Sequence, residues 1–415
     1  MSRLQTNPKT IAIDARMYGA GQTGIGNYIH HLMKYLFEID QKNNYLVFLL
    51  PEEYDKFELL NKRVKKIKVS AKWYGWKEQI IFPFEILKHK IDLIHFPHFN
   101  SPILYHWIVW IQNTISRRGI SRHASAKTVT TIHDLTPYYF PGHKMNSWIR
   151  RKGFRLVFST AVKKSSRVIA VSKYTKRDTV KIFLNNSQKI PLISSHKEGT
   201  IDKIQVIYEG VDEQFQVIKD YGKIKAIKEK YKITKPFIFY TGVWRNHKNL
   251  VGLIKAFDLI VNKYKINYQL ILGGKEDPYY PEARETWEKL NLDDKIVRTG
   301  FISKEELPLF YNAADIFVIP SFREGFGLIG LEAIACGTPV VSSNKTSLPE
   351  ILGNAAIYFN PADHQEMAEK IVKVIQDKDL KNSLIQKGFR QIEKYDWKRM
   401  AKETLEMYEE VMRGD

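Results

Sequence analysis

Two glutamates, Glu324 and Glu332, stand eight residues apart around a Gly-Phe-Gly turn that opens a predicted helix. The turn places the backbone N–H groups of Gly327 and Leu328 at the helix N-terminus, where orphan donors and the helix dipole favour a phosphate. A carboxylate on each side of this anion site suits the hydroxyl groups of a sugar and of a ribose. These residues predict the binding half of a nucleotide-sugar site.

Taken alone, two carboxylates at this spacing are weak evidence, because most such pairs are solvated helix charges. The whole string from Arg323 to Glu350, REGFGLIGLEAIACGTPVVSSNKTSLPE, resembles the Glu-x7-Glu signature of the retaining GT-B glycosyltransferases of family 4 (glycosyl transferases group 1). The resemblance covers nearly the whole chain in ordered pieces. It lies closest to the branch that builds bacterial surface polysaccharide, often as mannosyltransferases. It implies that Glu324 contacts the transferred sugar, Glu332 the ribose, and the intervening residues the donor, namely Gly325, Phe326, Gly327 and Leu328.

A basic loop follows the predicted strand 237–241 and holds Gly242, Arg245 and Lys248. Two cations at a strand end can neutralise the charge that grows on a departing nucleoside diphosphate. The alternative is a pair of solvated loop cations. The resemblance to the family's R-x-H-K-N form implies the functional role, with Gly242 on the donor side.

His133 and Asp134 end the predicted strand 128–132. By themselves they fit a histidine that caps a loop, with the aspartate as its partner. The triplet His133-Asp134-Leu135 resembles a family motif, which implies a histidine close to the anomeric carbon of the donor that binds a sugar hydroxyl. Ser172 is a helix N-cap by its position and, by resemblance, an acceptor or phosphate contact. His98 and Asn100, after the strand 92–96, are acceptor-side candidates.

Gly21, Gly24 and Gly26 form a predicted loop between the first strand, 11–14, and a helix near 27–37. The spacing G-x-x-G-x-G is not the dinucleotide fingerprint, and turns need glycine in any case. The resemblance implies that this loop borders the donor phosphates and the acceptor, with Gly24 and Gly26 on the donor side.

Short apolar runs alternate with helical segments, which predicts parallel sheets with helices on both faces. Further strands are expected at 45–50, 167–171, 205–208, 268–273, 296–299, 316–319 and 339–342. The pattern restarts near residue 237, so two doubly wound, Rossmann-like α/β domains are predicted, in the GT-B arrangement, with the site in a cleft between them. The expected domains are a basic acceptor-side domain (1–214), a nucleotide-sugar domain (215–395) and a helix (396–415) that returns to the first domain.

The positive charge lies entirely in the first half of the chain. Residues 1–200 hold 33 of the 65 basic and 13 of the 45 acidic residues, which gives this half a net charge of +20 and leaves the remainder neutral. This asymmetry predicts an anionic partner for the first half. Nucleic acid is disfavoured because no recognised binding module appears.

The leading hypothesis is a retaining hexosyltransferase that moves a sugar, mannose favoured, from a nucleoside-diphosphate donor to a lipid-linked or glycan acceptor. A same-fold epimerase or phosphorylase, a nucleic-acid-binding protein and a catalytically inactive scaffold are the alternatives. No Asp-x-Asp pair or Cys/His cluster has metal-site spacing, so no metal and no cofactor are expected. One cysteine and no evident signal peptide favour the cytoplasm, peripheral to the inner face of the plasma membrane.

Two apparent insertions depart from the family pattern, at 103–127 and 186–202. The first holds an apolar segment with Trp107 and Trp110, followed by Arg117, Arg118 and Arg122. Such a segment suits the interface of an anionic bilayer, helped by the cations of Lys62–Lys66 and by the aromatic residues of Trp73–Trp76. The alternative is a buried helix with a solvated basic end.

Overall fold

The structure is a computed structural model, and it describes residues 7–19, 23–58, 61–117, 126–145, 147–184 and 202–414. The chain divides into two compact units. Unit 1 comprises residues 1–138, 144–209 and 397–415, and unit 2 comprises 139–143 and 210–396. The division between the units falls at Glu209/Gly210, five residues before the predicted 214/215, and the last helix belongs to unit 1.

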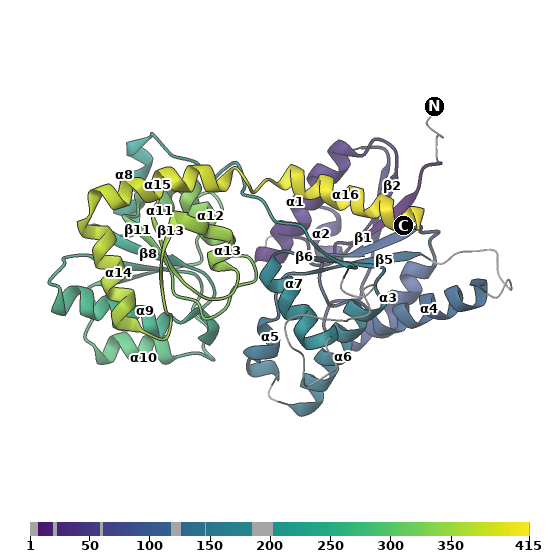
Figure 1. Cartoon of the computed structure of the whole chain (residues 1–415), viewed down its shortest axis with the longest axis horizontal. Helices are drawn as coiled ribbons and strands as arrows, with labels where there is room; N and C mark the ends of the chain where they lie inside the picture. The colour runs from purple at the N-terminus through teal and green to yellow at the C-terminus, as the bar shows by residue number, and fades with distance from the viewer. Residues whose placement is uncertain are drawn as a thin grey trace. The chain divides into compact units, whose positions relative to one another are not determined.

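Unit 1 is built on a parallel sheet that has seven strands within the described residues, in the order β3-β2-β1-β4-β5-β6-β7. Helices α1 and α16 cover one face of this sheet, and α3, α4 and α6 cover the other (Figure 1). The strands are β1 (Thr10–Asp14), β2 (Asn44–Leu49), β3 (Val64–Lys68), β4 (Leu93–Phe96), β5 (Lys127–Ile132), β6 (Arg167–Ala170) and β7 (Ile204–Val206). The helices are α1 (Thr23–Ile39), α2 (Pro51–Tyr54), α3 (Trp76–Leu87), α4 (Ile103–Arg117), α5 (Thr136–Tyr139), η1 (His143–Met145), α6 (Trp148–Lys164), α7 (Lys173–Thr179), the π-helical turn η2 (Val180–Leu184) and α16 (Trp397–Arg413).

Unit 2 repeats the plan with a parallel sheet that has six strands in the described part of the chain, in the order β10-β9-β8-β11-β12-β13. Its strands are β8 (Phe237–Thr241), β9 (Gln269–Gly273), β10 (Ile296–Gly300), β11 (Ile316–Ile319), β12 (Val340–Ser343) and β13 (Ala356–Phe359). Its helices are α8 (Tyr221–Lys230), η4 (Asn246–Lys248), α9 (Leu250–Asp258), the π-helical turn η5 (Leu259–Lys263), α10 (Glu282–Lys289), α11 (Leu307–Ala313), α12 (Leu328–Ala335), α13 (Leu348–Leu352), η6 (Gly353–Ala355), α14 (His364–Gln376) and α15 (Lys378–Ile392).

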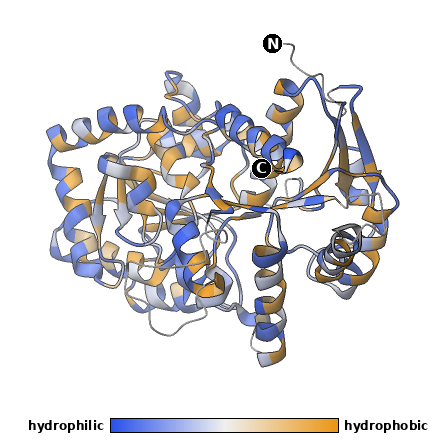
Figure 2. Cartoon of the chain, turned by 45° about the vertical axis from the view of Figure 1, so that its right-hand side comes forward, coloured by the Kyte–Doolittle hydropathy of each residue, from blue (hydrophilic) through white to orange (hydrophobic). Residues whose placement is uncertain are grey.

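Burial on both faces explains why the strands are apolar almost throughout. Ile11, Ala12 and Ile13 of β1 are fully buried, as are Ile316 to Ile319 of β11. Parallel strands between two helical layers need apolar side chains on both faces, whereas the helices alternate polar and apolar residues along their length (Figure 2). The predicted α/β fold of two doubly wound sheets is confirmed, and each predicted strand is present with its ends within two residues.

The sequence analysis did not predict two strands, β3 and β13, and both lie at the edge of a sheet. β3, with the sequence VKKIK, pairs with β2 alone. Its lysines are typical of an edge strand, where charge discourages pairing with another chain. The segment Lys62–Lys66, predicted as part of a membrane-facing cation cluster, therefore contributes to a sheet edge.

The last helix is an integral part of unit 1 although it is remote in sequence. Helix α16 packs along α1, and its buried side holds Met400, Met407 and Tyr408. The hydroxyl of Tyr408 is hydrogen-bonded to Nδ1 of the buried His95 on β4, and Trp397 stacks on His31 of α1 with ring centroids 4.6 Å apart. Unit 1 should therefore depend on α16 for its stability.

We expect Met407→Ala to lower the free energy of unfolding of unit 1 by about 2–5 kcal/mol, because it leaves a cavity between α16 and the rest of the unit. Met407 is 1% exposed. Urea unfolding followed by tryptophan fluorescence measures the change. Glu406→Ala, on the exposed side of the same helical turn, is the control and should change stability by less than about 0.5 kcal/mol. Equal stability of the two variants would contradict the prediction.

Candidate active site

An ion pair occupies the carboxyl end of the sheet in unit 2. Lys248, the last residue of η4 after β8, places Nζ 2.7 and 2.9 Å from the two carboxylate oxygens of Glu324, after β11. Both side chains are more than four-fifths buried. Ser321 donates a hydrogen bond of 2.6 Å to the same carboxylate. The structure thus brings together two residues that the sequence analysis had predicted separately.

The pair fixes the ionisation of Glu324. Burial alone raises the pKa of a carboxyl group, but the Lys248 ammonium and the Ser321 hydroxyl outweigh burial and hold the pKa of Glu324 below its usual value. Backbone hydrogen bonds fix the segment as well, since the Glu324 N–H donates to Thr346 Oγ1 and Ser347 donates to the Glu324 carbonyl. The carboxylate is an ionised acceptor whose negative charge Lys248 balances.

The glycine turn after Glu324 has the geometry that the sequence predicted. Gly327 is the N-cap of α12, and its φ of 104° lies in the left-handed region. A Cβ at this position would also lie 2.8 Å from Leu348 Cδ2. No side chain in the described part of the chain caps α12, which leaves its N-terminus suited to an anion. Phe326 is buried and packs edge-on against Tyr395, so it supports the turn from within.

Glu332 lies in a different environment, one helical turn farther along α12. The Tyr311 hydroxyl donates to its Oε2 at 2.9 Å. Burial, assisted by the negative charge of Asp212, raises the pKa of Glu332 to about 7, and the Tyr311 hydrogen bond offsets part of this rise. Glu324 and Glu332 therefore differ in ionisation near neutral pH.

Arg245 and Gly242 lie beside this site. The guanidinium of Arg245 is half-exposed, and its Nε lies 3.7 Å from Asp277, after β9. Among the contacts of the described residues, Arg245 thus reaches Asp277 rather than the Lys248–Glu324 pair. Gly242, with φ of 149°, is required by packing, because a Cβ there would lie 2.9 Å from the Tyr240 hydroxyl.

In unit 1, His133 is held between two acceptors. Its Nδ1 lies 3.1 Å from the carboxylate of Glu209, and its Nε2 lies 2.9 Å from the carbonyl oxygen of Pro97. A carbonyl only accepts, so Nε2 carries a proton, and a proton on Nδ1 as well gives Glu209 a charge-assisted hydrogen bond. Burial lowers the pKa of a histidine, but Glu209 outweighs it and the pKa of His133 is raised. This favours the imidazolium form.

Both ring nitrogens of His133 are engaged within unit 1, and its contact with a sugar hydroxyl stays a prediction. Glu209 was not singled out by the sequence analysis. It follows the short strand β7, and only its position at a strand end could have indicated a role.

Ser172 is fully buried and acts as the N-cap of α7. Its Oγ accepts a hydrogen bond of 3.0 Å from the Thr175 N–H, as its position in the sequence predicted. A direct ligand contact of Ser172 stays a prediction. Gly24 and Gly26 lie inside α1, which begins at Thr23, and not in the loop that was predicted. At Gly24 a Cβ would meet no atom within 4 Å, so glycine is not sterically required there. Gly21 lies outside the described residues.

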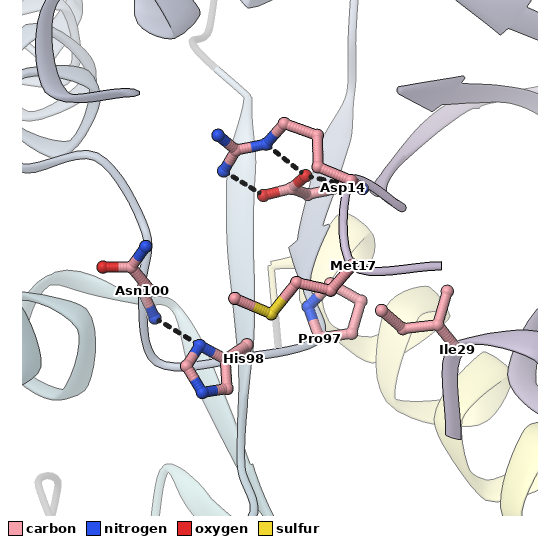
Figure 3. Close-up of a pocket in the computed structure, with 7 residues that line it drawn as sticks. Asp14, Met17, Ile29, Pro97, His98 and Asn100 are labelled. Atoms are coloured by element: carbon pink, nitrogen blue, oxygen red, sulfur yellow. Dashed lines mark hydrogen bonds and ion pairs between the residues drawn. The ribbon is translucent and has the colours of Figure 1, made fainter. Parts of the chain in front are cut away.

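A pocket at the carboxyl ends of β1 and β4 in unit 1 holds the two acceptor-side candidates. It is lined by Asp14, Arg16, Met17, Ile29, Pro97, His98 and Asn100 (Figure 3). The Asn100 N–H donates to Nδ1 of His98 at 3.3 Å. Burial, and then the charges of His133 and Arg16, lower the pKa of His98 well below its usual value. His98 is therefore neutral, in contrast to His133.

Two of the lining residues, Asp14 and Arg16, belong to a buried ion triad that Glu78 completes. The Arg16 guanidinium binds both oxygens of Asp14, at 2.8 and 2.7 Å, and lies 2.7 Å from Glu78 Oε1 on α3. Its remaining terminal nitrogen donates to the Ala71 carbonyl oxygen at 3.0 Å. The second oxygen of Glu78 accepts from the Tyr74 N–H and the Asn100 side chain. Sequence analysis missed the triad because Glu78 is 62 residues from Arg16 and only the fold brings the two together.

Comparison with known proteins agrees with this geometry. The family model described as glycosyl transferases group 1 matches residues 223–391, and the model described as glycosyltransferase family 4 matches residues 23–195. The chain belongs to this glycosyltransferase family. The family resemblance that the sequence analysis identified is confirmed.

The curated relatives of this glycosyltransferase include proteins of O-antigen synthesis. It is 26% identical to O-antigen chain mannosyltransferase B of Escherichia coli, over 69% of this chain and 71% of the relative. It is 30% identical to O-antigen chain mannosyltransferase RfbU of Salmonella typhimurium, over 59% and 60%. It is 28% identical to serotype-specific mannosyltransferase WbdA of Escherichia coli, but it spans only 34% of that longer protein.

Solved structures confirm the GT-B fold. Sucrose-phosphate synthase of Thermosynechococcus elongatus matches with a TM-score of 0.73 at 19% identity, over 98% of this chain and all of that one. WaaG, a glycosyltransferase of lipopolysaccharide biosynthesis, matches with a TM-score of 0.65 at 13% identity, over 98% of this chain and all of that one. Among the described residues, no three His, Cys, Asp or Glu side chains cluster in a way that could hold a metal ion.

The raised pKa of Glu332 predicts a loss of stability with rising pH. In the folded state the Glu332 carboxyl has a pKa of about 7, whereas in the unfolded state its pKa is near 4.5. The contribution of Glu332 to the free energy of unfolding is therefore fully present below pH 4.5 and is lost as the pH rises through 7. The loss is at most about 3 kcal/mol. Glu332→Gln should flatten this part of the pH profile. Urea titrations of both proteins at pH 5, 6.5 and 8 measure it, and parallel profiles would contradict it.

The ion triad predicts a large effect of Glu78→Gln on unit 1. Glu78 and Arg16 are both buried, so the substitution leaves the guanidinium short of one counter-charge in a low-dielectric site. We expect a loss of about 3 kcal/mol in the free energy of unfolding. Glu85→Gln on the same helix breaks a surface pair with Lys88 and should cost less than about 0.5 kcal/mol. Equal midpoints of thermal unfolding for the two variants would refute the proposed energetics.

Proposed function

We propose that this glycosyltransferase is a retaining hexosyltransferase that moves mannose from a nucleoside-diphosphate sugar to a lipid-linked or glycan acceptor in surface polysaccharide synthesis. The observation that carries the proposal is the Lys248–Glu324 pair beside the uncapped N-terminus of α12, with Glu332 on the same helix. The relatives named as mannosyltransferases of O-antigen chains support mannose. A fold neighbour, HepE of Anabaena, was solved with UDP-glucose, which supports a nucleotide-sugar donor.

Unit 2 supplies the groups that a donor requires. The Lys248 ammonium and the N-terminus of α12 would bind the diphosphate, and the turn at Gly327 lets the backbone approach it. Glu324, ionised and oriented by Ser321, would accept a hydrogen bond from the transferred sugar. Glu332 would accept a hydrogen bond from a ribose hydroxyl, which requires its ionised form. Because the pKa of Glu332 is about 7, donor binding would then release a proton near neutral pH.

The reaction we propose is a front-face displacement without a metal. The bond between the anomeric carbon and the diphosphate oxygen breaks, and the acceptor oxygen forms its bond on the same face of the sugar. The acceptor proton passes to the departing phosphate oxygen. Lys248 and the helix N-terminus stabilise the charge on the leaving group, a role worth about 3–4 kcal/mol per donor in comparable sites.

His133 is suited to stabilising negative charge and not to abstracting a proton. Both ring nitrogens face acceptors and the pKa is raised, so no lone pair is available for a proton. The pocket of unit 1, lined by Asp14, His98 and Asn100 among others, offers one carboxylate and neutral polar groups to an acceptor sugar. We propose that the acceptor enters there.

A donor screen tests the proposal. Purified chain is incubated with GDP-mannose, UDP-glucose and other nucleotide sugars in EDTA, and nucleotide release and the anomeric configuration of the product are measured. One donor should be hydrolysed or transferred with retention, and activity should persist in EDTA. A free epimerised sugar nucleotide would instead support an epimerase. Release of a sugar 1-phosphate when phosphate is added would support a phosphorylase. Activity that is lost in EDTA and restored by Mg²⁺ would overturn the metal-free mechanism.

Lys248→Met should lower turnover with the preferred donor by about 10²–10³-fold, because it removes a cation from the leaving group. Lys255→Met, at an exposed position of α9, is the matched control and should leave turnover unchanged. Thermal unfolding of both variants verifies that the fold is kept. Full turnover in Lys248→Met would remove this lysine from the donor site.

A further inference from the structure

Exposed apolar side chains gather on one face of unit 1. Ten of the seventeen large apolar side chains that are exposed among the described residues lie on α3, α4 and α6. Helix α3 packs against α4, and α4 against α6, on the same side of the sheet (Figure 1). Apolar patches of this kind on a protein surface mark an interaction site. We refer to the exposed apolar and basic residues of these three helices as the docking face.

The apolar residues of α3 form one stripe. Trp76, Ile80, Phe84 and Leu87 follow one another at helical spacing and are 65%, 51%, 53% and 38% exposed. The opposite side of α3, with Phe82 and other residues, is buried in unit 1. A helix whose inner side already packs in the core has no structural need for a second apolar side.

Helices α4 and α6 continue the docking face. On α4, Trp107, Trp110 and Ile111 are nearly half-exposed, whereas Tyr105 and Val109 point into the core. The predicted alternative, a buried helix, is thus wrong for this side of α4. Trp148 and Ile149 begin α6 and are 64% and 63% exposed.

Cations flank the apolar residues. The exposed basic residues in this region are Lys77, Arg150, Arg151, Lys152, Arg155, Lys163 and Lys164. Lys152 lies over the ring of Trp148 at 4.6 Å, and Lys164 over the ring of Trp110 at 4.9 Å. The three helices contain two acidic residues, Glu78, which is buried against Arg16, and Glu85, which pairs with Lys88.

This composition points to a single occupant. Tryptophan beside lysine and arginine is the pattern of the headgroup region of an anionic membrane. A second copy of the chain fits poorly, because two such faces would bring like charges together. We propose that the docking face binds the surface of an anionic lipid bilayer, with the rings of α3, α4 and α6 at headgroup depth.

The predicted membrane-binding segment is thereby revised. Lys62–Lys66 contributes to β3 at the sheet edge, and Arg118 and Arg122 lie outside the described residues, as does most of the 186–202 insertion. Trp76 and the α6 cations, in contrast, join Trp107 and Trp110. No helix in the described part of the chain is long and apolar enough to span a bilayer, so the proposal concerns surface binding.

The docking face adjoins the acceptor pocket. Helix α3 begins with Trp76 on the surface, and two residues later the buried Glu78 pairs with Arg16, which lines the pocket. Tyr74, 63% exposed, donates its N–H to Glu78 and places its hydroxyl 3.5 Å from His98 Nε2. If the proposed function holds, a lipid-linked acceptor at the bilayer surface lies next to the pocket.

Co-sedimentation of the full chain with vesicles tests the docking face. The vesicles contain phosphatidylcholine with 0 to half phosphatidylglycerol, at several salt concentrations. Binding should rise with the anionic lipid and fall with salt. Trp76→Ser with Phe84→Ser should weaken binding at least tenfold. Lys152→Gln with Lys164→Gln should weaken it about 25-fold at low salt, since each cation near the surface contributes about fivefold.

Matched controls lie on α8 of unit 2. Tyr221→Ser, at an 81% exposed position, and Lys223→Gln with Lys225→Gln should bind vesicles as the unsubstituted chain does. Binding that is unchanged in both docking-face variants, or absent for the unsubstituted chain, overturns the proposal. Self-association that both variants abolish would identify a second copy as the occupant and also overturn it.

Donor hydrolysis in vesicle-free buffer separates this proposal from the proposed function. The docking-face variants should keep full hydrolysis, because their substituted residues lie on the surface of unit 1. If neither the variants nor the unsubstituted chain hydrolyse any donor, the enzymatic proposal is refuted. The vesicle measurement still decides the proposal on the docking face in that case.

Discussion

The constraint on which the site depends is the exclusion of charge from a parallel sheet covered on both faces. The interiors of β1 and β11 are fully buried, so ionisable groups collect where the strands end. Asp14 ends β1, His133 follows β5, and Lys248 and Glu324 follow β8 and β11. Parallel strands bring these ends to one edge of each sheet. Groups gathered at that edge are partly shielded from water, and each must find an opposite charge or shift its pKa.

The individual outcomes differ because the partners differ. Glu324 has Lys248 and stays ionised, whereas Glu332 has the neutral hydroxyl of Tyr311 and its pKa rises to about 7. The same contrast separates His133, which faces the carboxylate of Glu209, from His98, which faces the charges of His133 and Arg16. Residue type alone therefore does not fix the chemistry of these positions, and the nearest charged neighbour does.

This explains how far the sequence could predict the structure. The buried strands are continuous apolar runs, so their positions and the restart of the pattern near residue 237 were evident. Glu324, Glu332 and Lys248 were identified because they lie in local motifs. Glu209, 76 residues from His133, and Glu78, 62 residues from Arg16, belong to no such motif, and only the folded chain brings them to their partners. The strand β3 was missed because lysines at a sheet edge resemble a solvated charge cluster.

Helix α3 joins the two faces of unit 1 that the proposals use. Its inner side carries Glu78, which the Arg16 guanidinium and the Tyr74 and Asn100 hydrogen bonds hold in one position. Its outer side carries Trp76, Ile80 and Phe84. Because a helix turns about 100° per residue, fixing Glu78 also fixes the direction of the exposed stripe. The Arg16–Glu78 ion pair next to the pocket therefore also orients the docking face. Under the proposed membrane binding, this ion pair, and not a flexible loop, would set the position of a bilayer relative to the pocket.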